Sequence, residues 1–120
     1  MRPQCANPLV HLELHTGSLA HACAFYTRMF DWPPERLQAC SRRYLSLDLG
    51  ALGGGMVECG TERPLWLPYV RVPAIGMAAQ LAQELGASVL LEPSEGPGGW
   101  RCVVSDPAAG QVALWQPKRG

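Results

Sequence analysis

Apolar and polar residues alternate near the start of the chain and then change to a helical spacing. The segment Pro8 to His15 is predicted to be a half-buried strand with Val10 and Leu14 on its apolar face. From Leu19 to Phe30 apolar residues recur three and four positions apart, which predicts an amphipathic helix. The apolar face of the strand is the surface that this helix is expected to cover.

The same order of elements returns 56 residues later, since position 67 corresponds to position 11. A second strand is expected from Trp66 to Val72 and a second helix from Ile75 to Leu85. Three short strands are expected after each helix, at Arg36 to Ala39, Tyr44 to Leu49 and Gly55 to Cys59, and at Ser88 to Glu92, Trp100 to Ser105 and Gln111 to Gln116. The duplicated strand–helix–strand–strand–strand order predicts an α+β fold whose two modules close around a shared cleft.

The length of 120 residues favours one domain, with module one at about 8–60 and module two at about 65–117. Hydrophobic residues make up 48% of the chain and charged residues 17%, which is typical of a globular protein. The net charge of zero gives no long-range attraction for nucleic acid or for an anionic membrane, so neither is expected as a partner. No apolar run approaches the roughly 18 residues of a membrane span.

Five cysteines are scattered along the chain without a Cys-x-x-Cys pair. An odd number at irregular spacing argues against a disulfide framework and favours a reducing compartment. No secretory signal sequence is recognisable after Met1. We therefore expect a cytoplasmic protein.

Several short sequences resemble those of one large superfamily. They are Ala24-Phe25-Tyr26, Phe30-Asp31-Trp32, Gly98-Gly99-Trp100, and Asp106-Pro107 with Gly110 before Ala113-Leu114-Trp115. Their order, together with the repeat, resembles the vicinal oxygen chelate superfamily of glyoxalase I, bleomycin resistance proteins and extradiol dioxygenases. The resemblance covers about Pro8 to Pro117. It implies two tandem βαβββ modules forming an open curved mixed sheet around a cleft, and a homodimer.

Metal-dependent members of that superfamily place their ligands on the first and last strands of each module. A divalent ion held there by His and Glu can chelate two substrate oxygens and act as a Lewis acid. The resemblance puts His11 and Glu58 at two of the four positions, whereas Leu67 and Ala113 at the other two cannot bind a metal. We therefore expect an incomplete or absent metal site and no cofactor.

The residues leave two alternatives open for this site. Glu13 and His15 share the strand face of His11, so either of them can complete a divalent metal site of a different kind from the superfamily's. Alternatively these side chains line a wet cleft and hydrogen-bond to one another, and Glu13 or Glu58 then serves as a metal-free general base.

Aromatic and cationic side chains are expected on the matching strands of module two. Tyr69 and Arg71 share the face of Leu67, and Trp115 shares that of Ala113, an arrangement that suits a planar or anionic molecule. The alternative is that Trp115 packs at an interface and Arg71 is a solvated strand end. The predicted ligand-binding cleft consists of His11, Glu13, His15, Glu58, Tyr69, Arg71 and Trp115.

Two functions follow from these residues. The first is a small-molecule binding protein of the glyoxalase and bleomycin resistance type, with an incomplete or absent metal site. The second is a metal-dependent lyase, isomerase or dioxygenase that uses His11 and Glu58 with a third ligand from Glu13 or His15.

Overall fold

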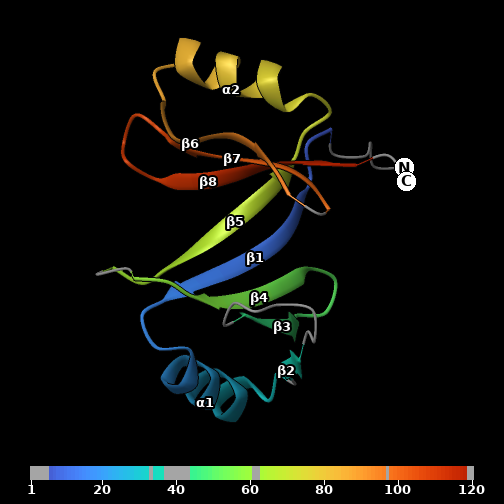
Figure 1. Cartoon of the computed structure of the whole chain (residues 1–120), viewed down its shortest axis with the longest axis vertical. Coiled ribbons are helices and arrows are strands. Elements are labelled where there is room, and N and C mark those ends of the chain that lie inside the picture. Colours follow the sequence, from blue (N-terminus) through green and yellow to red (C-terminus); the bar gives the residue numbers. More distant parts are fainter. Residues whose placement is uncertain (1–5, 33, 37–43, 61–62, 97, 119–120) are drawn as a thin grey trace. The chain divides into compact units, whose positions relative to one another are not determined.

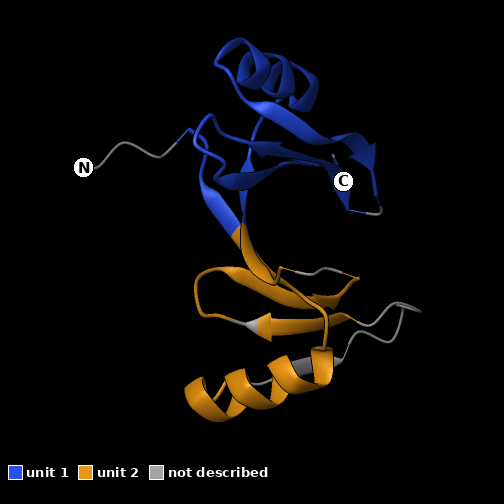
Figure 2. Cartoon of the chain, turned by 90° about the vertical axis from the view of Figure 1, so that its left-hand side faces the viewer, with its two compact units in different colours: residues 1–10, 68–120 blue, residues 11–67 orange. Residues whose placement is uncertain are grey.

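The computed structural model describes residues 6–32, 34–36, 44–60, 63–96 and 98–118 (Figure 1). The chain divides into two compact units. Unit 1 consists of residues 1–10 and 68–120, and unit 2 of residues 11–67 (Figure 2). The divisions fall inside strands β1 (Leu9–Thr16) and β5 (Leu65–Arg71), so each of these strands contributes residues to both units.

Unit 2 contains one helix and a sheet in the strand order β2-β3-β4-β1. Its elements are α1 (Leu19–Phe30), β2 (Pro34–Arg36), β3 (Tyr44–Asp48), β4 (Gly53–Glu58) and most of β1. Strand β1 runs parallel to β4, and the other neighbours are antiparallel. The buried side chains of Leu14, Leu47 and Met56 form the core, and Ala22 and Tyr26 of α1 pack against them. One face of the sheet is therefore covered by α1.

The aromatic residues of unit 2 extend this core. The ring of Tyr26 lies 5.9 Å from that of Trp32 and 5.3 Å from that of Trp66, between centroids. The indole Nε1–H of Trp66 donates a hydrogen bond to the Tyr26 hydroxyl oxygen at 3.3 Å. These tryptophans pack against the core cluster of the unit.

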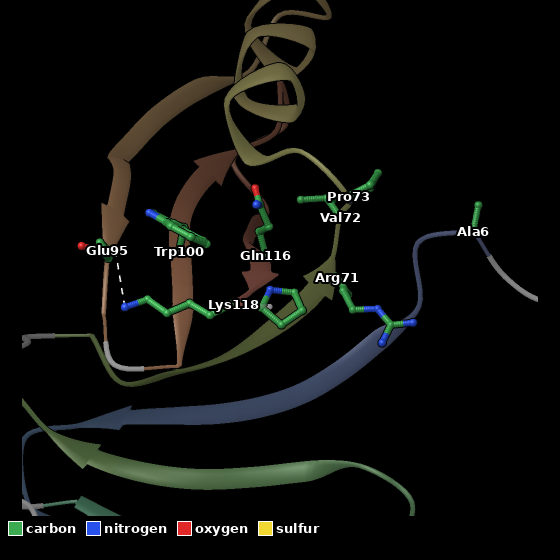
Figure 3. Close-up of a pocket in the computed structure, with 9 residues that line it drawn as sticks. Ala6, Arg71, Val72, Pro73, Glu95, Trp100, Gln116 and Lys118 are labelled. Atoms are coloured by element: carbon green, nitrogen blue, oxygen red, sulfur yellow. Dashed lines mark ion pairs between the residues drawn. The ribbon is translucent and has the colours of Figure 1, made fainter. Parts of the chain in front are cut away.

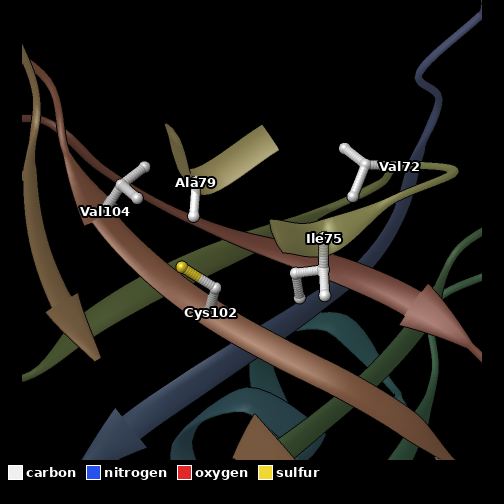
Figure 4. Packing of buried hydrophobic residues seen from close by; sticks show 5 residues of the cluster. All are labelled: Val72, Ile75, Ala79, Cys102 and Val104. Carbon is white, nitrogen blue, oxygen red and sulfur yellow. The ribbon is translucent and has the colours of Figure 1, made fainter. Parts of the chain in front are cut away.

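Unit 1 repeats the arrangement with the strand order β5-β8-β7-β6. Its elements after β5 are α2 (Ile75–Glu84), β6 (Ser88–Glu95), β7 (Gly99–Ser105) and β8 (Gln111–Pro117). Strand β5 is parallel to β8, and β8, β7 and β6 pair antiparallel. The core lies between α2 and the sheet and consists of Val72, Ile75, Ala79, Cys102 and Val104 (Figure 4).

The predicted order of elements is confirmed, and with it the α+β class of two βαβββ copies. Helix α1 has the predicted bounds. Strand β6 continues through Pro93 to Glu95, past its predicted end at Glu92. Because β6 is the last strand in the order and its register shifts twice, it tolerates a proline that donates no ladder hydrogen bond. The strand predicted at Arg36 to Ala39 overlaps β2 at Arg36, and its remainder lies outside the described residues.

No helix in the part of the chain that the structure describes combines the length and the apolar character needed to cross a membrane.

Candidate functional site

Three titratable side chains project from the face of β1 that points away from α1. They are His11, Glu13 and His15, which alternate with the core residue Leu14. The Glu13 carboxylate lies between the two imidazoles. Its Oε1 is 2.9 Å from His15 Nε2, and its Oε2 is 3.6 Å from His11 Nε2. His15 Nε2 is the donor of this hydrogen bond when the Glu13 carboxylate is ionised, because an ionised carboxylate only accepts.

Glu13 is buried, with a relative exposure of 8%. A buried carboxylate is costly unless hydrogen bonds or opposite charges compensate for its lost hydration. The imidazoles supply such compensation, and they are themselves about one quarter exposed, at 25% for His11 and 26% for His15. The cluster therefore combines a fixed carboxylate with two imidazoles that solvent or a ligand reaches.

Tyr44 is a member of this face that sequence analysis did not single out. Tyr44, Val57 and His15 lie in one row across β3, β4 and β1. The Tyr44 ring leans over Gly55, the register partner of Glu13, and a Cβ at Gly55 would clash with the hydroxyl oxygen of that ring. Its place on this face follows from the pairing of β3 with β4 and of β4 with β1.

Glu58 does not share this face, so the prediction that it lies beside His11 is wrong. It pairs with Thr16, in the register that aligns Met56 with Leu14 of the core, and therefore projects on the α1 side of the sheet. There its Oε1 accepts a hydrogen bond of 3.0 Å from the backbone N–H of Leu19. The carboxylate thus sits at the amino end of α1, where the unpaired N–H groups and the helix dipole favour a negative charge.

The residues present do not fit the metal site of the superfamily. His11 and Glu58, the two predicted ligands, lie on opposite faces of the sheet of unit 2. Of the described residues, no three His, Cys, Asp or Glu side chains are placed to hold one metal ion. On the β1 face the Glu13 carboxylate is hydrogen-bonded to His15 and lies within ion-pair distance of His11.

In unit 1, Tyr69, Arg71 and Trp115 share the sheet face that points away from α2, as their alternation predicted. Tyr69 is buried at 6% exposure. Its hydroxyl oxygen accepts a hydrogen bond of 3.2 Å from Nη1 of Arg101. Arg101 was not predicted, although its alternation with the core residue Cys102 in β7 was a usable signal.

Trp115 is held against the beginning of β7. Its ring lies next to Gly98 and Gly99, and a Cβ at Gly99 would clash with the carbonyl oxygen of Gln116 and the Cα of Pro117. Trp115 is therefore a packed residue of the sheet face. Arg71 is exposed at the end of β5.

Solved structures with the same fold place the chain in a structural class. A hypothetical protein, BH1468 from Bacillus halodurans, superposes with a TM-score of 0.70 at 16% identity, covering 97% of this chain and 98% of that one. Methylmalonyl-CoA epimerase from Mycobacterium tuberculosis gives 0.66 at 13% identity, covering 99% and 94%. The chain has the vicinal oxygen chelate fold.

A third such structure is a variant of methylmalonyl-CoA epimerase from Streptomyces coelicolor in complex with 2-nitronate-propionyl-CoA. It gives a TM-score of 0.65 at 15% identity, covering 96% of this chain and 100% of that one. No protein-family model matches the sequence, and no curated protein matches it. At these identities the likeness concerns the fold.

Proposed function

We propose that the protein binds a small polar molecule on the face of β1 that carries His11, Glu13 and His15. The observation that supports this most strongly is the 2.9 Å contact between His15 Nε2 and the buried Glu13 carboxylate. A buried carboxylate held by imidazoles is a fixed acceptor, and the partly exposed imidazoles add donors and acceptors beside it. Small-molecule binding of the glyoxalase and bleomycin resistance type is consistent with the fold.

The proposed binding does not use the metal chemistry of the superfamily. Glu58, the expected carboxylate ligand, is engaged at the amino end of α1, and Leu67 and Ala113 offer no metal-binding atoms. We therefore propose that the β1 face works through hydrogen bonds and charge, without a bound divalent ion.

A ligand screen tests this proposal. Thermal unfolding is followed in EDTA with propionyl-CoA, methylmalonyl-CoA and 2-oxo acids. The two CoA thioesters are chosen because methylmalonyl-CoA and 2-nitronate-propionyl-CoA are bound in structures of the neighbouring epimerases. We expect at least one compound to raise the melting temperature of the wild type and not of Glu13→Gln. Glu84→Gln, which changes an exposed carboxylate on α2, is the control and keeps the shift. An equal shift in Glu13→Gln contradicts the proposal.

A second candidate function is metal-free proton transfer, favoured by the burial of Glu13. The carboxylate takes a proton from a carbon next to the carbonyl group of a bound substrate, and the proton then returns to that carbon. Exchange of deuterium from D2O into methylmalonyl-CoA, followed by NMR, measures this step. Catalysis is supported if the wild type exchanges deuterium and Glu13→Gln does not. If the wild type binds methylmalonyl-CoA without exchange, the protein binds this compound and does not catalyse proton transfer.

We further propose a homodimer in the cytoplasm. The cysteines within the described residues, Cys23, Cys59 and Cys102, are free thiols, which suits a reducing compartment. The dimer is proposed on the superfamily resemblance, and light scattering coupled to size-exclusion chromatography measures it. A mass of twice 13.0 kDa supports the proposal, and a mass of 13.0 kDa contradicts it.

A further inference from the structure

Large apolar side chains are exposed on both helices. Of the eight such side chains that are exposed among the described residues, six belong to α1 or to α2 with its C-cap residue. They are Phe25, Met29 and Phe30 on α1, and Met77, Leu81 and Leu85 on α2. Each helix packs one side against its own sheet, and these residues take no part in that packing (Figure 1). Apolar side chains gathered on an exposed surface mark a site of association.

The 56-residue repeat relates the two exposed surfaces position by position. Helix α1 begins at Leu19 and α2 begins 56 residues later, at Ile75. By the same shift, Phe25 and Met29 of α1 correspond to Leu81 and Leu85 of α2. Residues four positions apart share one side of a helix, so both helices present an apolar pair at the same place.

The charged residue beside each apolar pair has the opposite sign. Arg28 of α1 corresponds to Glu84 of α2, and each is the only Lys, Arg, Asp or Glu of its helix. Both are exposed, and neither forms an ion pair with another described residue. By contrast, Lys118 and Glu95 in unit 1 pair with each other, with 3.4 Å between Nζ and Oε2 (Figure 3). The two helix surfaces are therefore complementary in charge.

The surface of α2 is hollowed beside its apolar side chains. A groove of about 740 Å³ is lined by Met77, Leu81 and Leu85, and by Leu114 of β8. An aromatic side chain that fills such a groove is a common anchor of protein interfaces. Phe25 of α1 is an exposed aromatic side chain of this kind.

We propose that α1 of one copy of the chain packs against α2 of a second copy. Phe25 and Met29 then contact the apolar residues of the second copy's α2, and Arg28 pairs with Glu84. The two helices run antiparallel, because corresponding flanks of two helices lie on the same side of an antiparallel contact and on opposite sides of a parallel one. An antiparallel contact of α1 with α1, or of α2 with α2, brings like charges together and is disfavoured.

This contact rests on the proposed homodimer and assigns it an interface. In a dimer with two-fold symmetry, the contact between α1 and the second copy's α2 forms twice. A substitution on either helix therefore acts at both contacts, which increases its effect on self-association.

Charge reversal tests the proposed pairing. Arg28→Glu and Glu84→Arg each place like charges at the contact, and each is expected to weaken self-association at least about tenfold in sedimentation velocity. The double variant restores opposite charges, as does an equimolar mixture of the two single variants, and both are expected to associate about as tightly as the wild type. Reversal is used instead of neutralisation because the loss of one exposed ion pair has little effect.

The apolar part of the contact has a matched control. Leu81 on α2 and Leu90 on β6 are both 53% exposed, so their replacement by glutamine changes similar surfaces. Leu81→Gln is expected to weaken self-association about tenfold, whereas Leu90→Gln is expected to leave it unchanged. Circular dichroism of each variant confirms that it is folded.

Two kinds of result overturn the proposal, and they are distinguishable. A monomeric wild type contradicts the homodimer and the contact together, and leaves these helix surfaces to a different partner. With a dimeric wild type, the contact alone is contradicted if the single charge reversals leave the affinity unchanged, if the double variant does not recover it, or if Leu81→Gln behaves like Leu90→Gln.

Discussion

The carboxylate of Glu58, at the end of β4, accepts a hydrogen bond of 3.0 Å from the backbone N–H of Leu19, the first residue of α1. The Ser18 side chain accepts the N–H of His21, so two side chains satisfy donors at the amino end of this helix. A residue expected to bind a metal is thus part of the structural link between the last strand of unit 2 and its helix.

Glu58→Ala is therefore expected to lower the free energy of unfolding by about 1–2 kcal/mol, the range for removing a helix cap. Urea denaturation followed by circular dichroism measures this change. Glu84→Ala serves as the control, because this exposed α2 residue caps no helix N–H group, and it is expected to change stability by less than about 0.5 kcal/mol. Equal effects of the two substitutions contradict the capping role.

The hydrogen bond between Trp66 and Tyr26 makes a second prediction. Tyr26→Phe keeps the ring stacking but leaves the indole N–H of Trp66 without its acceptor in a partly buried position. We expect a loss of about 1 kcal/mol, the usual cost of a buried donor left unpaired. Denaturant titration measures it, with Met29→Leu as the control, since Met29 of the same helix is 62% exposed. Unchanged stability in Tyr26→Phe shows that the bond contributes nothing.

Gly99 is predicted to tolerate no side chain. A Cβ there meets backbone atoms of Gln116 and Pro117, which move only with strand β8. Gly99→Ala is expected to cost more than about 2 kcal/mol, as overpacking against backbone does. Gly60→Ala is the matched control, because nothing lies within 4 Å of a Cβ at Gly60. Thermal unfolding of both variants distinguishes them, and similar melting temperatures contradict the close approach.

Cys102 is predicted to be unreactive in the folded protein. Burial raises the pKa of its thiol above the ordinary value of 9.0, and the negative charge of Glu92 adds to this shift. The unfolded chain then loses this proton at a lower pH than the folded chain, so stability falls as the pH rises past 9.0. Alkylation with iodoacetamide at pH 8, followed by peptide mass spectrometry, is expected to modify half-buried Cys59 well before Cys102. Equal rates contradict the prediction.

The order of the elements was predictable because apolar spacing is strong in this chain. Helix α1 and strand β8 have apolar residues at regular positions. Those of α1 pack against the core of unit 2, and those of β8 pack against the core of unit 1. The face of β4 was not predictable, since Met56 and Val57 are both apolar and the alternation leaves the parity open. A shift of one residue in the alternation exchanges the two faces of a strand. Glu58 therefore lies on the α1 side of the sheet and not on the face of His11, where it was expected.

The site residues divide in the same way, into those that one strand places and those that strand pairing places. His11, Glu13 and His15 alternate with leucines on one strand, so their common face follows from β1 alone. Tyr44 joins that face only through the pairing of β3, β4 and β1, and Arg101 reaches Tyr69 only through the register of β7 and β8. Pairing between strands distant in sequence depends on tertiary packing, which a single sequence does not display.

We propose that the β1 face works without a bound metal ion because Glu58 is engaged at α1. Metal content tests it most directly. Protein purified without a histidine tag is loaded with Ni, Zn, Mn or Fe, dialysed against metal-free buffer and analysed by mass spectrometry of the elements, alongside His11→Ala. We expect substoichiometric metal that is equal in both proteins. One retained ion per chain in the wild type, lost in His11→Ala, would contradict it.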